Sequence, residues 1–318
     1  MYGAVDFYKA CKAEGIKPII GCEVYVADGS RFEKIHTPDY FNCHLVLLVE
    51  NEKGYENLIY MVSKAFTEGF YMKPRIDSDL LREHSEGLIC LSGCLSGHIS
   101  RAIVRGDTNE AEQYARELLE IFGKDNFFIE LQSNGIPEQE TVNDEAIKIA
   151  KKLGIGIVAT NDVHYLDRSD AQTQAVLMCI QTNTRLSSEG APRFGSNDFY
   201  YRSTDEMKRL FESLPEAIEN TVNIANRCNF DFVFGKNRLP AYTPPDGYTP
   251  KAFLEKLARQ GLEEKIKSGE ITFNDEITED DYKARLIYEL MMISKTGYEQ
   301  YYLIVWDFVN YARNAGIS

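Results

Sequence analysis

The sequence has no apolar run long enough to cross a membrane and no segment that directs secretion. Its 318 residues include no uninterrupted stretch near the roughly 20 apolar residues that a bilayer span needs. Residues 1–20 also lack the basic and then apolar plan of a signal peptide. We therefore expect a cytoplasmic protein that does not associate with membranes.

Short motifs of several enzyme classes are missing too. The sequence contains no G-x-S-x-G elbow, Walker loop, H-E-x-x-H pair or dinucleotide-binding glycine fingerprint, which counts against triad hydrolases, P-loop enzymes, zincins and dehydrogenases. No C-x-x-C pair is present to form a zinc knuckle. The seven cysteines are odd in number and lie in apolar stretches, so they indicate reduced thiols rather than a disulfide framework.

Positive charge is scarce. The chain has 35 Lys and Arg against 49 Asp and Glu, a net charge of −14. Residues 1–235 hold 24 basic and 36 acidic side chains, whereas residues 236–318 hold 11 and 13. Binding along DNA depends on Lys and Arg that neutralise phosphates, so any contact with nucleic acid must be local. We interpret most of the carboxylates as solvated helix faces.

The first two thirds of the chain alternate short apolar runs with helical periodicity, as βα units around a parallel sheet or barrel do. The runs predict strands at 18–26, 44–49, 87–91, 127–131 and 155–159, and the periodicity predicts helices at 4–13, 56–65, 108–122 and 138–153. After Thr160 the pattern changes to helices alone, at 169–180, 204–211, 215–227, 250–267, 279–295 and 300–314. Four prolines between Pro240 and Pro250 predict an extended connector. We expect a domain boundary near Gly235.

The sequence TNDVHY, at residues 160–165, follows a predicted strand directly. In βα barrels the carboxyl ends of the strands form the active-site face. Asp162 and His164, two residues apart on an extended backbone, would point the same way and offer oxygen and nitrogen ligands to Zn, Mn or Fe. Alone, the pair is better explained by a turn aspartate that caps a helix and a histidine satisfied by the backbone, so the metal site depends on further ligands nearby.

Three more candidate ligands lie in or beside other predicted strands. Glu23 interrupts the apolar run PIIGCEVYV, His44 opens HLVLLV, and Cys94 lies in the glycine-rich turn LSGCLSG. Each has a structural explanation by itself, such as a water-exposed strand end for Glu23. A barrel would bring all of them to one rim together with Asp162 and His164. We do not expect His36, His84 or His98 to be ligands, although His98 is placed to support one.

Eight longer segments occur in one order along the whole chain. They are 3–27 (GAVDFYKACKAEGIKPIIGCEVYVA), 44–58 (HLVLLVENEKGYENL), 68–77 (EGFYMKPRID), 91–99 (LSGCLSGHI), 130–139 (ELQSNGIPEQ), 158–166 (VATNDVHYL), 232–249 (FVFGKNRLPAYTPPDGYT) and 297–318 (GYEQYYLIVWDFVNYARNAGIS). Together they resemble the polymerase and histidinol phosphatase (PHP) domain of the bacterial C-family replicative DNA polymerases, the DNA polymerase III alpha subunits.

This resemblance implies an α/β fold and a metal site. Residues 1–235 would form a distorted (β/α)7 PHP barrel that lacks its first strands, and residues 236–318 a mainly helical connector and the beginning of the polymerase palm. Glu23, His44, Cys94, Asp162 and His164 fall on family positions that bind up to three divalent metals (Zn, Mn or Mg).

The remaining family motifs do not occur in the chain. The other ligands lie in an H-x-H strand and a T-D-H-G-N segment before a sequence like Met1-Tyr2-Gly3, so we expect Met1 to be internal to a longer protein. The palm's V-G-P-G-R-G-S segment and catalytic aspartates would follow a sequence like AGIS. We therefore expect the polymerase catalytic residues to lie outside this chain.

The resemblance also implies a function for the full-length protein. That function is template-directed DNA synthesis with Mg held by palm aspartates, while a complete PHP site would hydrolyse phosphodiesters or pyrophosphate, including 3′-5′ proofreading. The implied partners are DNA and dNTPs through missing regions, the sliding clamp and a separate exonuclease subunit. With half of its ligands missing, this chain would bind metal weakly and be inactive.

Two alternatives remain open. A self-standing phosphatase of the histidinol-phosphate type would leave residues 236–318 without a purpose. The second alternative is a scaffold without catalytic activity that keeps its metal ligands as relics.

Overall fold

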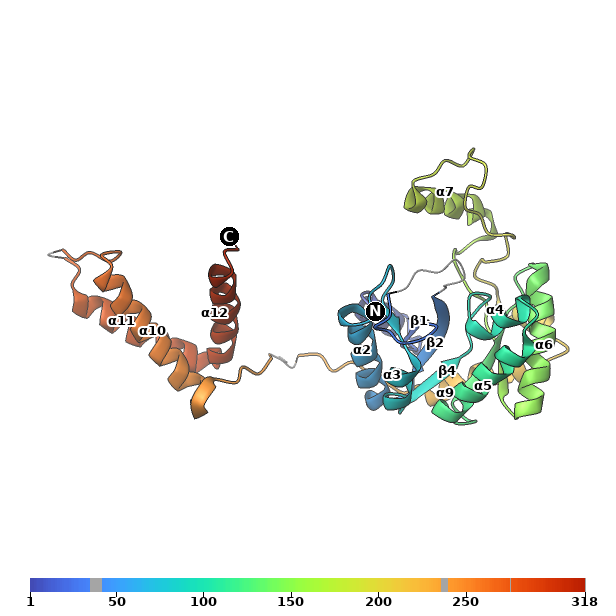
Figure 1. Ribbon diagram of the computed structural model, residues 1–318, viewed down its shortest axis with the longest axis horizontal. Helices are drawn as coiled ribbons and strands as arrows, with labels where there is room; N and C mark the ends of the chain where they lie inside the picture. Colours follow the sequence, from blue (N-terminus) through green and yellow to red (C-terminus); the bar gives the residue numbers. More distant parts are fainter. Residues whose placement is uncertain (35–41, 236–239, 275, 318) are drawn as a thin grey trace. The chain divides into compact units, whose positions relative to one another are not determined.

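The computed structural model describes residues 1–34, 42–235, 240–274 and 276–317 (Figure 1). Its chain divides into two units, Met1–Phe232 and Val233–Ser318. The first unit contains all of the strands of the described residues, and the second contains helices. The α/β domain followed by a helical segment that the sequence predicts is thus confirmed.

Six strands form one sheet in the order β3-β1-β2-β4-β5-β6. Their bounds are β1 (Gly21–Val26), β2 (Cys43–Val49), β3 (Arg75–Ile76), β4 (Leu88–Leu91), β5 (Phe127–Leu131) and β6 (Gly156–Ala159). Five of them lie within three residues of their predicted positions. β3 was not predicted, because two residues are too few to show a period.

The expectation of an all-parallel βα arrangement is wrong at β2. This strand runs antiparallel to both of its neighbours, β1 and β4, whereas β4, β5 and β6 are parallel to one another. Antiparallel neighbours do not require a crossover helix. As a result, the amino end of β2 lies at the same edge of the sheet as the carboxyl ends of β1 and β4.

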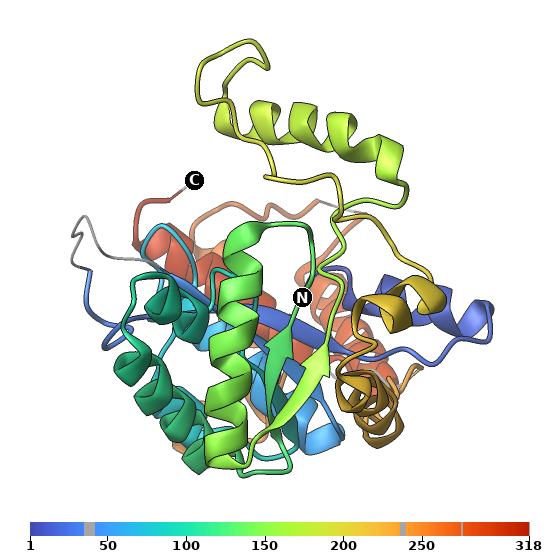
Figure 2. The same ribbon diagram turned by 90° about the vertical axis from the view of Figure 1, so that its right-hand side faces the viewer.

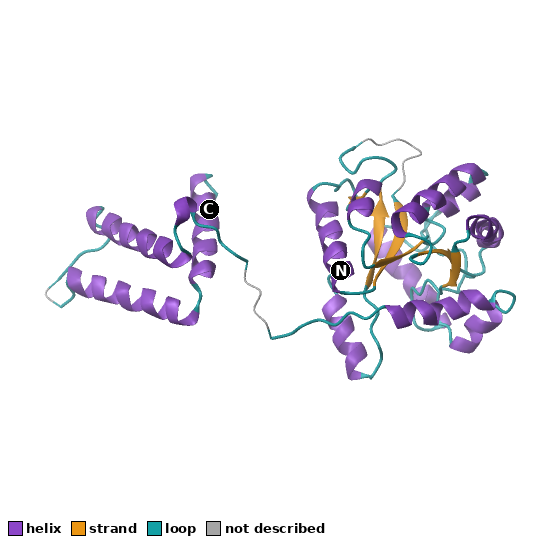
Figure 3. Ribbon diagram, turned by 90° about the horizontal axis from the view of Figure 1, so that it is seen from below, coloured by secondary structure: helices purple, strands orange, loops and turns teal. Residues whose placement is uncertain are grey.

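Helices surround the sheet, as Figure 3 shows with the strands in orange. In the first unit they are α1 (Ala4–Ala13), α2 (Glu52–Thr67), α3 (Ser78–Glu83), α4 (His98–Val104), α5 (Thr108–Phe122), α6 (Pro137–Leu153), the 3-10 turn η1 (Arg168–Asp170), α7 (Ala171–Thr182), α8 (Thr204–Leu210) and α9 (Pro215–Arg227). Side-chain oxygens of Asn51, Asp77 and Asp107 cap α2, α3 and α5. α3 and α4 were not predicted, since six or seven residues give too little periodicity.

The two faces of the sheet carry two hydrophobic clusters. Side chains of one face, such as Leu47 and Ile129, pack with α2, α4, α5 and α6 into the larger core. The opposite face carries a smaller cluster that includes Leu91, Phe128 and Ile224 of α9. The polar residues of the candidate site continue this second face toward the carboxyl ends of β4, β5 and β6.

Gly54 in the first turn of α2 brings the helix against the backbone that leads into β4. A Cβ at Gly54 would lie 1.8 Å from the carbonyl oxygen of Gly87. We predict that Gly54→Ala lowers the free energy of unfolding by about 2–3 kcal/mol, as overpacking does when backbone must move. Urea unfolding measures this, with Gly261→Ala, which has open space around it, as the control.

α7 stands away from the sheet. Figures 1 and 2 both show it projecting beyond the edge where β5 and β6 end. Val176, Leu177 and Ile180 on this helix are exposed. The segment that follows α7 turns back toward the sheet and delivers Phe194 and Phe199 to the candidate site.

The second unit consists of η2 (Pro245–Gly247), α10 (Pro250–Lys267), α11 (Glu279–Thr296) and α12 (Glu299–Asn314). Phe253, Leu290 and Leu303 form its small buried centre. No helix of the described residues is both long enough and apolar enough to span a membrane.

Candidate metal centre

Three of the predicted ligands lie in contact at the edge of the sheet. His44 Nδ1 is 3.0 Å from Glu23 Oε1 and 3.7 Å from Cys94 Sγ. The three ligand atoms all lie within 4.8 Å of one another. Oxygen, nitrogen and sulfur donors thus converge as they do around protein-bound divalent metals.

The register of β1 and β2 accounts for the contact between Glu23 and His44. Glu23 lies opposite Val46 and Tyr25 lies opposite His44. Directly opposite residues share a face, so Glu23 and His44 are diagonal neighbours on one face of the sheet. Glu23 is therefore a half-exposed member of the strand rather than a residue at its end.

The turn after β4 carries Cys94 to the same place. Gly93 has a φ of 84°, and a Cβ there would lie 2.7 Å from the carbonyl oxygen of His44, so glycine permits the close approach to β2. The backbone N–H of His44 donates to Ser96, and the N–H of Ser96 donates to the Cys94 sulfur at 3.4 Å. The Cys94 thiol is half-buried in this turn.

Asp162 and His164 form a second pair beside these three. The two side chains are 3.8 Å apart, Oδ1 to Nδ1. The extended backbone expected between them is wrong, because Asp162 has a φ of 53°, in the left-handed region. His164 Nδ1 lies 2.9 Å from the carbonyl oxygen of Asp162 and must donate to it, which leaves Nε2 as the free acceptor of the neutral ring.

All five predicted residues line one cavity of about 310 Å³. The tight cluster comprises Glu23, His44 and Cys94, whereas Asp162 and His164 lie further along the wall. The rings of Phe194 and Phe199 stack on each other and contact His164, with centroids 4.6 and 5.4 Å from its ring. These rings give one side of the cavity an apolar wall.

The charges of the cluster are strongly coupled. Hydrogen bonds with Cys94 and Glu23 raise the pKa of His44 to about 10, and the hydrogen bond from His44 lowers the pKa of Glu23. Burial, together with repulsion by Glu23, raises the pKa of Asp162. Without a cation, an imidazolium between Glu23 and Cys94 therefore supplies the positive charge of the site.

We predict that His44 in the metal-free protein titrates near pH 10, which NMR of the ring can follow. Since this pKa lies above the reference value of 6.5, the contact stabilises the fold fully below pH 6.5, and that stabilisation is lost as the pH rises through about 10. Glu23→Gln should lower the pKa of His44, whereas Glu56→Gln on α2 should not. A value near 6.5 in the unmodified protein would contradict the geometry.

Sequence reasoning missed Glu130 at the end of β5. Its carboxylate accepts hydrogen bonds from Gly93 N–H (3.0 Å), Gln132 Nε2 (3.1 Å) and the Thr160 hydroxyl (2.5 Å). Burial raises its pKa. Through Gly93 it fixes the turn that carries Cys94. The signal was present in the sequence, since Glu130 interrupts an apolar strand just as Glu23 does.

The other histidines have separate surroundings. His36 lies outside the described residues. His84 ends α3, with its ring 4.4 Å from Tyr60 and its Nδ1 near Asn57. His98 begins α4 and contacts Asp28 and Glu110, away from the cavity of Glu23 and His44.

Two parts of the chain match known protein families. Residues 1–134 match the family described as PHP domain, and residues 252–318 match the family described as Bacterial DNA polymerase III alpha NTPase domain. A PHP domain with a carboxylate, imidazole and thiol cluster at its edge fits a divalent metal.

The whole chain is similar to proteins named DNA polymerase III subunit alpha. The DNA polymerase III subunit alpha of Treponema pallidum (strain Nichols) is 42% identical over 319 residues, which cover 100% of this chain and 26% of that protein. The proteins of the same name from Borreliella burgdorferi and Thermus aquaticus are 41% and 37% identical, again over 100% of this chain and over 27% and 30% of their own lengths. The chain is thus homologous to DNA polymerase III alpha subunits, as its sequence segments predict, and spans about a quarter of the length of these curated relatives.

Proposed function

We propose that residues 1–235 form the metal-dependent phosphoesterase-like domain of a replicative DNA polymerase. The observation that carries this proposal is the cavity of about 310 Å³ that Glu23, His44, Cys94, Asp162 and His164 line together. In a full-length DNA polymerase III alpha subunit, such a site would hydrolyse a phosphodiester at a DNA 3′ end or pyrophosphate.

Glu23, His44 and Cys94 would hold a divalent cation, with Asp162 and His164 as further ligands. Thiolate and imidazole donors favour Zn²⁺ over Mg²⁺, which prefers oxygen ligands. The cation would supply electrophilic polarisation of a phosphoryl oxygen and a more acidic bound water. Burial, together with repulsion by Glu23, raises the pKa of Asp162, and a nearby cation would offset both effects.

The protein side chains have roles of their own in this proposal. His164 is held by its Nδ1–H bond to the backbone, so its Nε2 is directed as an acceptor of a ligand or proton. Phe194 and Phe199 would exclude water from one side of a bound phosphate. Glu130 would keep Cys94 in place through the backbone of Gly93.

The full-length protein, in this proposal, synthesises DNA in the cytoplasm from dNTPs on a template. Homology over the whole chain supports this activity. Residues 236–318 would be the connector and the beginning of the palm, whose aspartates would hold Mg²⁺ outside this chain. DNA, the sliding clamp and a separate exonuclease subunit would be bound through other regions of the protein.

The test uses the full-length protein and a primer with a mismatched 3′ end. Stripping the metals with a chelator should abolish degradation of the primer, and adding Zn²⁺ or Mn²⁺ while dNTPs are withheld should restore it. Extension of a matched primer with Mg²⁺ is the separate check on polymerase activity. Degradation that survives stripping would contradict the metal-dependent site, and its complete absence with every metal would favour the scaffold alternative.

A further inference from the structure

A second cluster with the same three kinds of donor lies behind the first. Asp28 follows β1, Cys43 is the first residue of β2, and His98 is the first residue of α4. Successive side chains of a strand point to opposite faces, so Cys43 and its neighbour His44 lie on opposite sides of β2. Cys94 lies in the turn between β4 and α4, and His98 begins α4 directly after that turn.

The spacing of the donors suits a bound ion better than a hydrogen bond. The ligand atoms of Asp28, Cys43 and His98 all lie within 4.8 Å of one another, and Asp28 Oδ1 is 3.8 Å from His98 Nδ1. Two ligands on one Zn²⁺ lie about 3.3–3.8 Å apart, given metal–ligand bonds of about 2.0–2.3 Å in a tetrahedral arrangement. A direct hydrogen bond between these two groups would be shorter.

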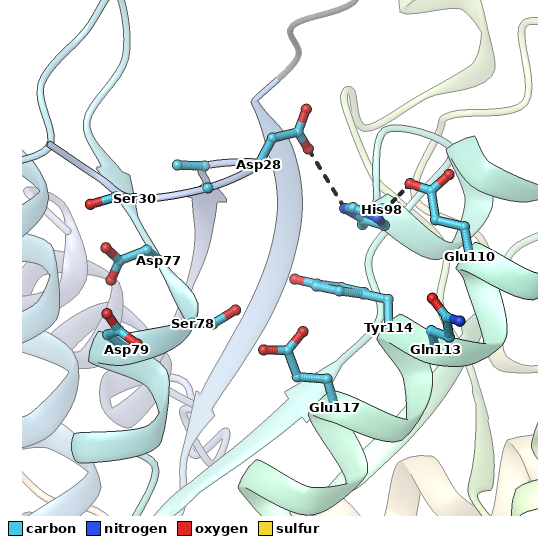
Figure 4. Close-up of a pocket in the computed structure, with 12 residues that line it drawn as sticks. Asp28, Ser30, Asp77, Ser78, Asp79, His98, Glu110, Gln113, Tyr114 and Glu117 are labelled. Atoms are coloured by element: carbon cyan, nitrogen blue, oxygen red, sulfur yellow. Dashed lines mark hydrogen bonds and ion pairs between the residues drawn. The ribbon is translucent and has the colours of Figure 1, made fainter. Parts of the chain in front are cut away.

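The other nitrogen of His98 is held as it is in metal-binding histidines. His98 Nε2 lies 3.0 Å from Glu110 Oε1, and the ring stacks on Tyr114 at 4.1 Å between centroids. A carboxylate that accepts the second N–H of a histidine fixes the ring and its tautomer for metal binding at the other nitrogen. Figure 4 shows His98 between Asp28 and Glu110.

The cavity beside Asp28 and His98 carries several acidic side chains. It has a volume of about 420 Å³, and its lining includes Asp28, Asp79, Glu110 and Glu117. Arg105 pairs with Glu110 Oε2 at 2.7 Å and so neutralises part of this charge. Cys43 is buried at the inner end of the cluster.

We propose that Asp28, Cys43 and His98 form a second divalent cation site, for Zn²⁺ or another ion that accepts thiolate and imidazole ligands. An ion there would tie together the end of β1, the beginning of β2 and the beginning of α4. These segments adjoin His44 and Cys94, so the second site would support the first from behind. The site stands independently of any phosphoesterase activity.

The test is a Co²⁺ titration of the 318-residue chain, followed by the absorption of cobalt–thiolate bonds. The Cys94→Ser variant has no thiol at the first site. The cobalt–thiolate band of the second site, through Cys43, should remain in this variant. Adding Asp28→Asn or His98→Gln should remove it, and adding Glu110→Gln should weaken Co²⁺ binding about 10- to 100-fold, the usual cost of losing the partner of a metal-bound histidine. Glu120→Gln, an exposed position on the same helix α5, should change nothing.

A missing band in folded Cys94→Ser, or a band that survives both Asp28→Asn and His98→Gln, would overturn the second site. If circular dichroism shows that Cys94→Ser does not fold, Asp28→Asn is made in the unmodified chain. It should then lower the number of bound Co²⁺ ions by one, and an unchanged number would equally overturn the proposal. Asp28 is exposed, so this substitution leaves the core intact.

Discussion

In the full-length protein, Asp162→Asn should slow metal-dependent degradation of a mismatched primer by roughly 100-fold or more, while extension of a matched primer stays within about twofold. Losing even an outer-shell partner of a metal ligand typically costs 10- to 100-fold, and Asp162 would be a ligand itself. The amide keeps the shape of the side chain and removes its charge, so packing around it should persist. The polymerase aspartates would lie elsewhere in the protein.

Asp205→Asn is the matched control for this change. Asp205 is an exposed aspartate in the first turn of α8, outside the cavity of the five candidate ligands. Both variants should melt within a few degrees of the unmodified protein. Degradation that is equal in Asp162→Asn and Asp205→Asn would show that the proofreading proposal is wrong.

His44→Gln should weaken divalent metal binding to the isolated chain by about 100-fold, because it removes the donor that touches both Glu23 and Cys94. The measurement is the cobalt–thiolate band in a Cys43→Ser background. The second site then has no thiol, so the band comes from cobalt bound to Cys94. The band should therefore appear at much higher Co²⁺ concentration in the variant.

His84→Gln provides the control for His44→Gln, because His84 is a half-buried histidine that packs on Tyr60 instead. It should leave the titration unchanged. Equal cobalt binding by His44→Gln and His84→Gln would mean that the contact of Glu23, His44 and Cys94 is an ion pair with no role in metal binding.

Much of the first unit could be predicted because its strands and longer helices have clear periods. β5 and α5 begin and end where the sequence predicts, at 127–131 and 108–122. The direction of β2 could not be predicted, because a run such as HLVLLV does not show whether its neighbours are parallel or antiparallel. His44 nevertheless lies at the edge where the neighbouring strands finish, because the reversed direction of β2 brings its amino end there.

The site was less predictable than the fold. Glu23, His44 and Cys94 come together through strand register and a glycine turn, which no single motif encodes. The backbone at Asp162 adopts a left-handed conformation that the strand pattern did not indicate. His98 was not expected to be a ligand, because its partners Asp28 and Glu110 lie 70 residues before it and 12 residues after it.

The metal assignment is tested most directly by crystals of the 318-residue chain grown with Zn²⁺ and measured on both sides of the zinc absorption edge. The five candidate ligands predict an anomalous peak about 2.0–2.3 Å from donor atoms of Glu23, His44 and Cys94. A peak at Asp28 and His98 would report on the second site alone. Zinc-saturated crystals with no peak within about 3 Å of Glu23, His44 and Cys94 would contradict the account, since none of the three would then be a metal ligand.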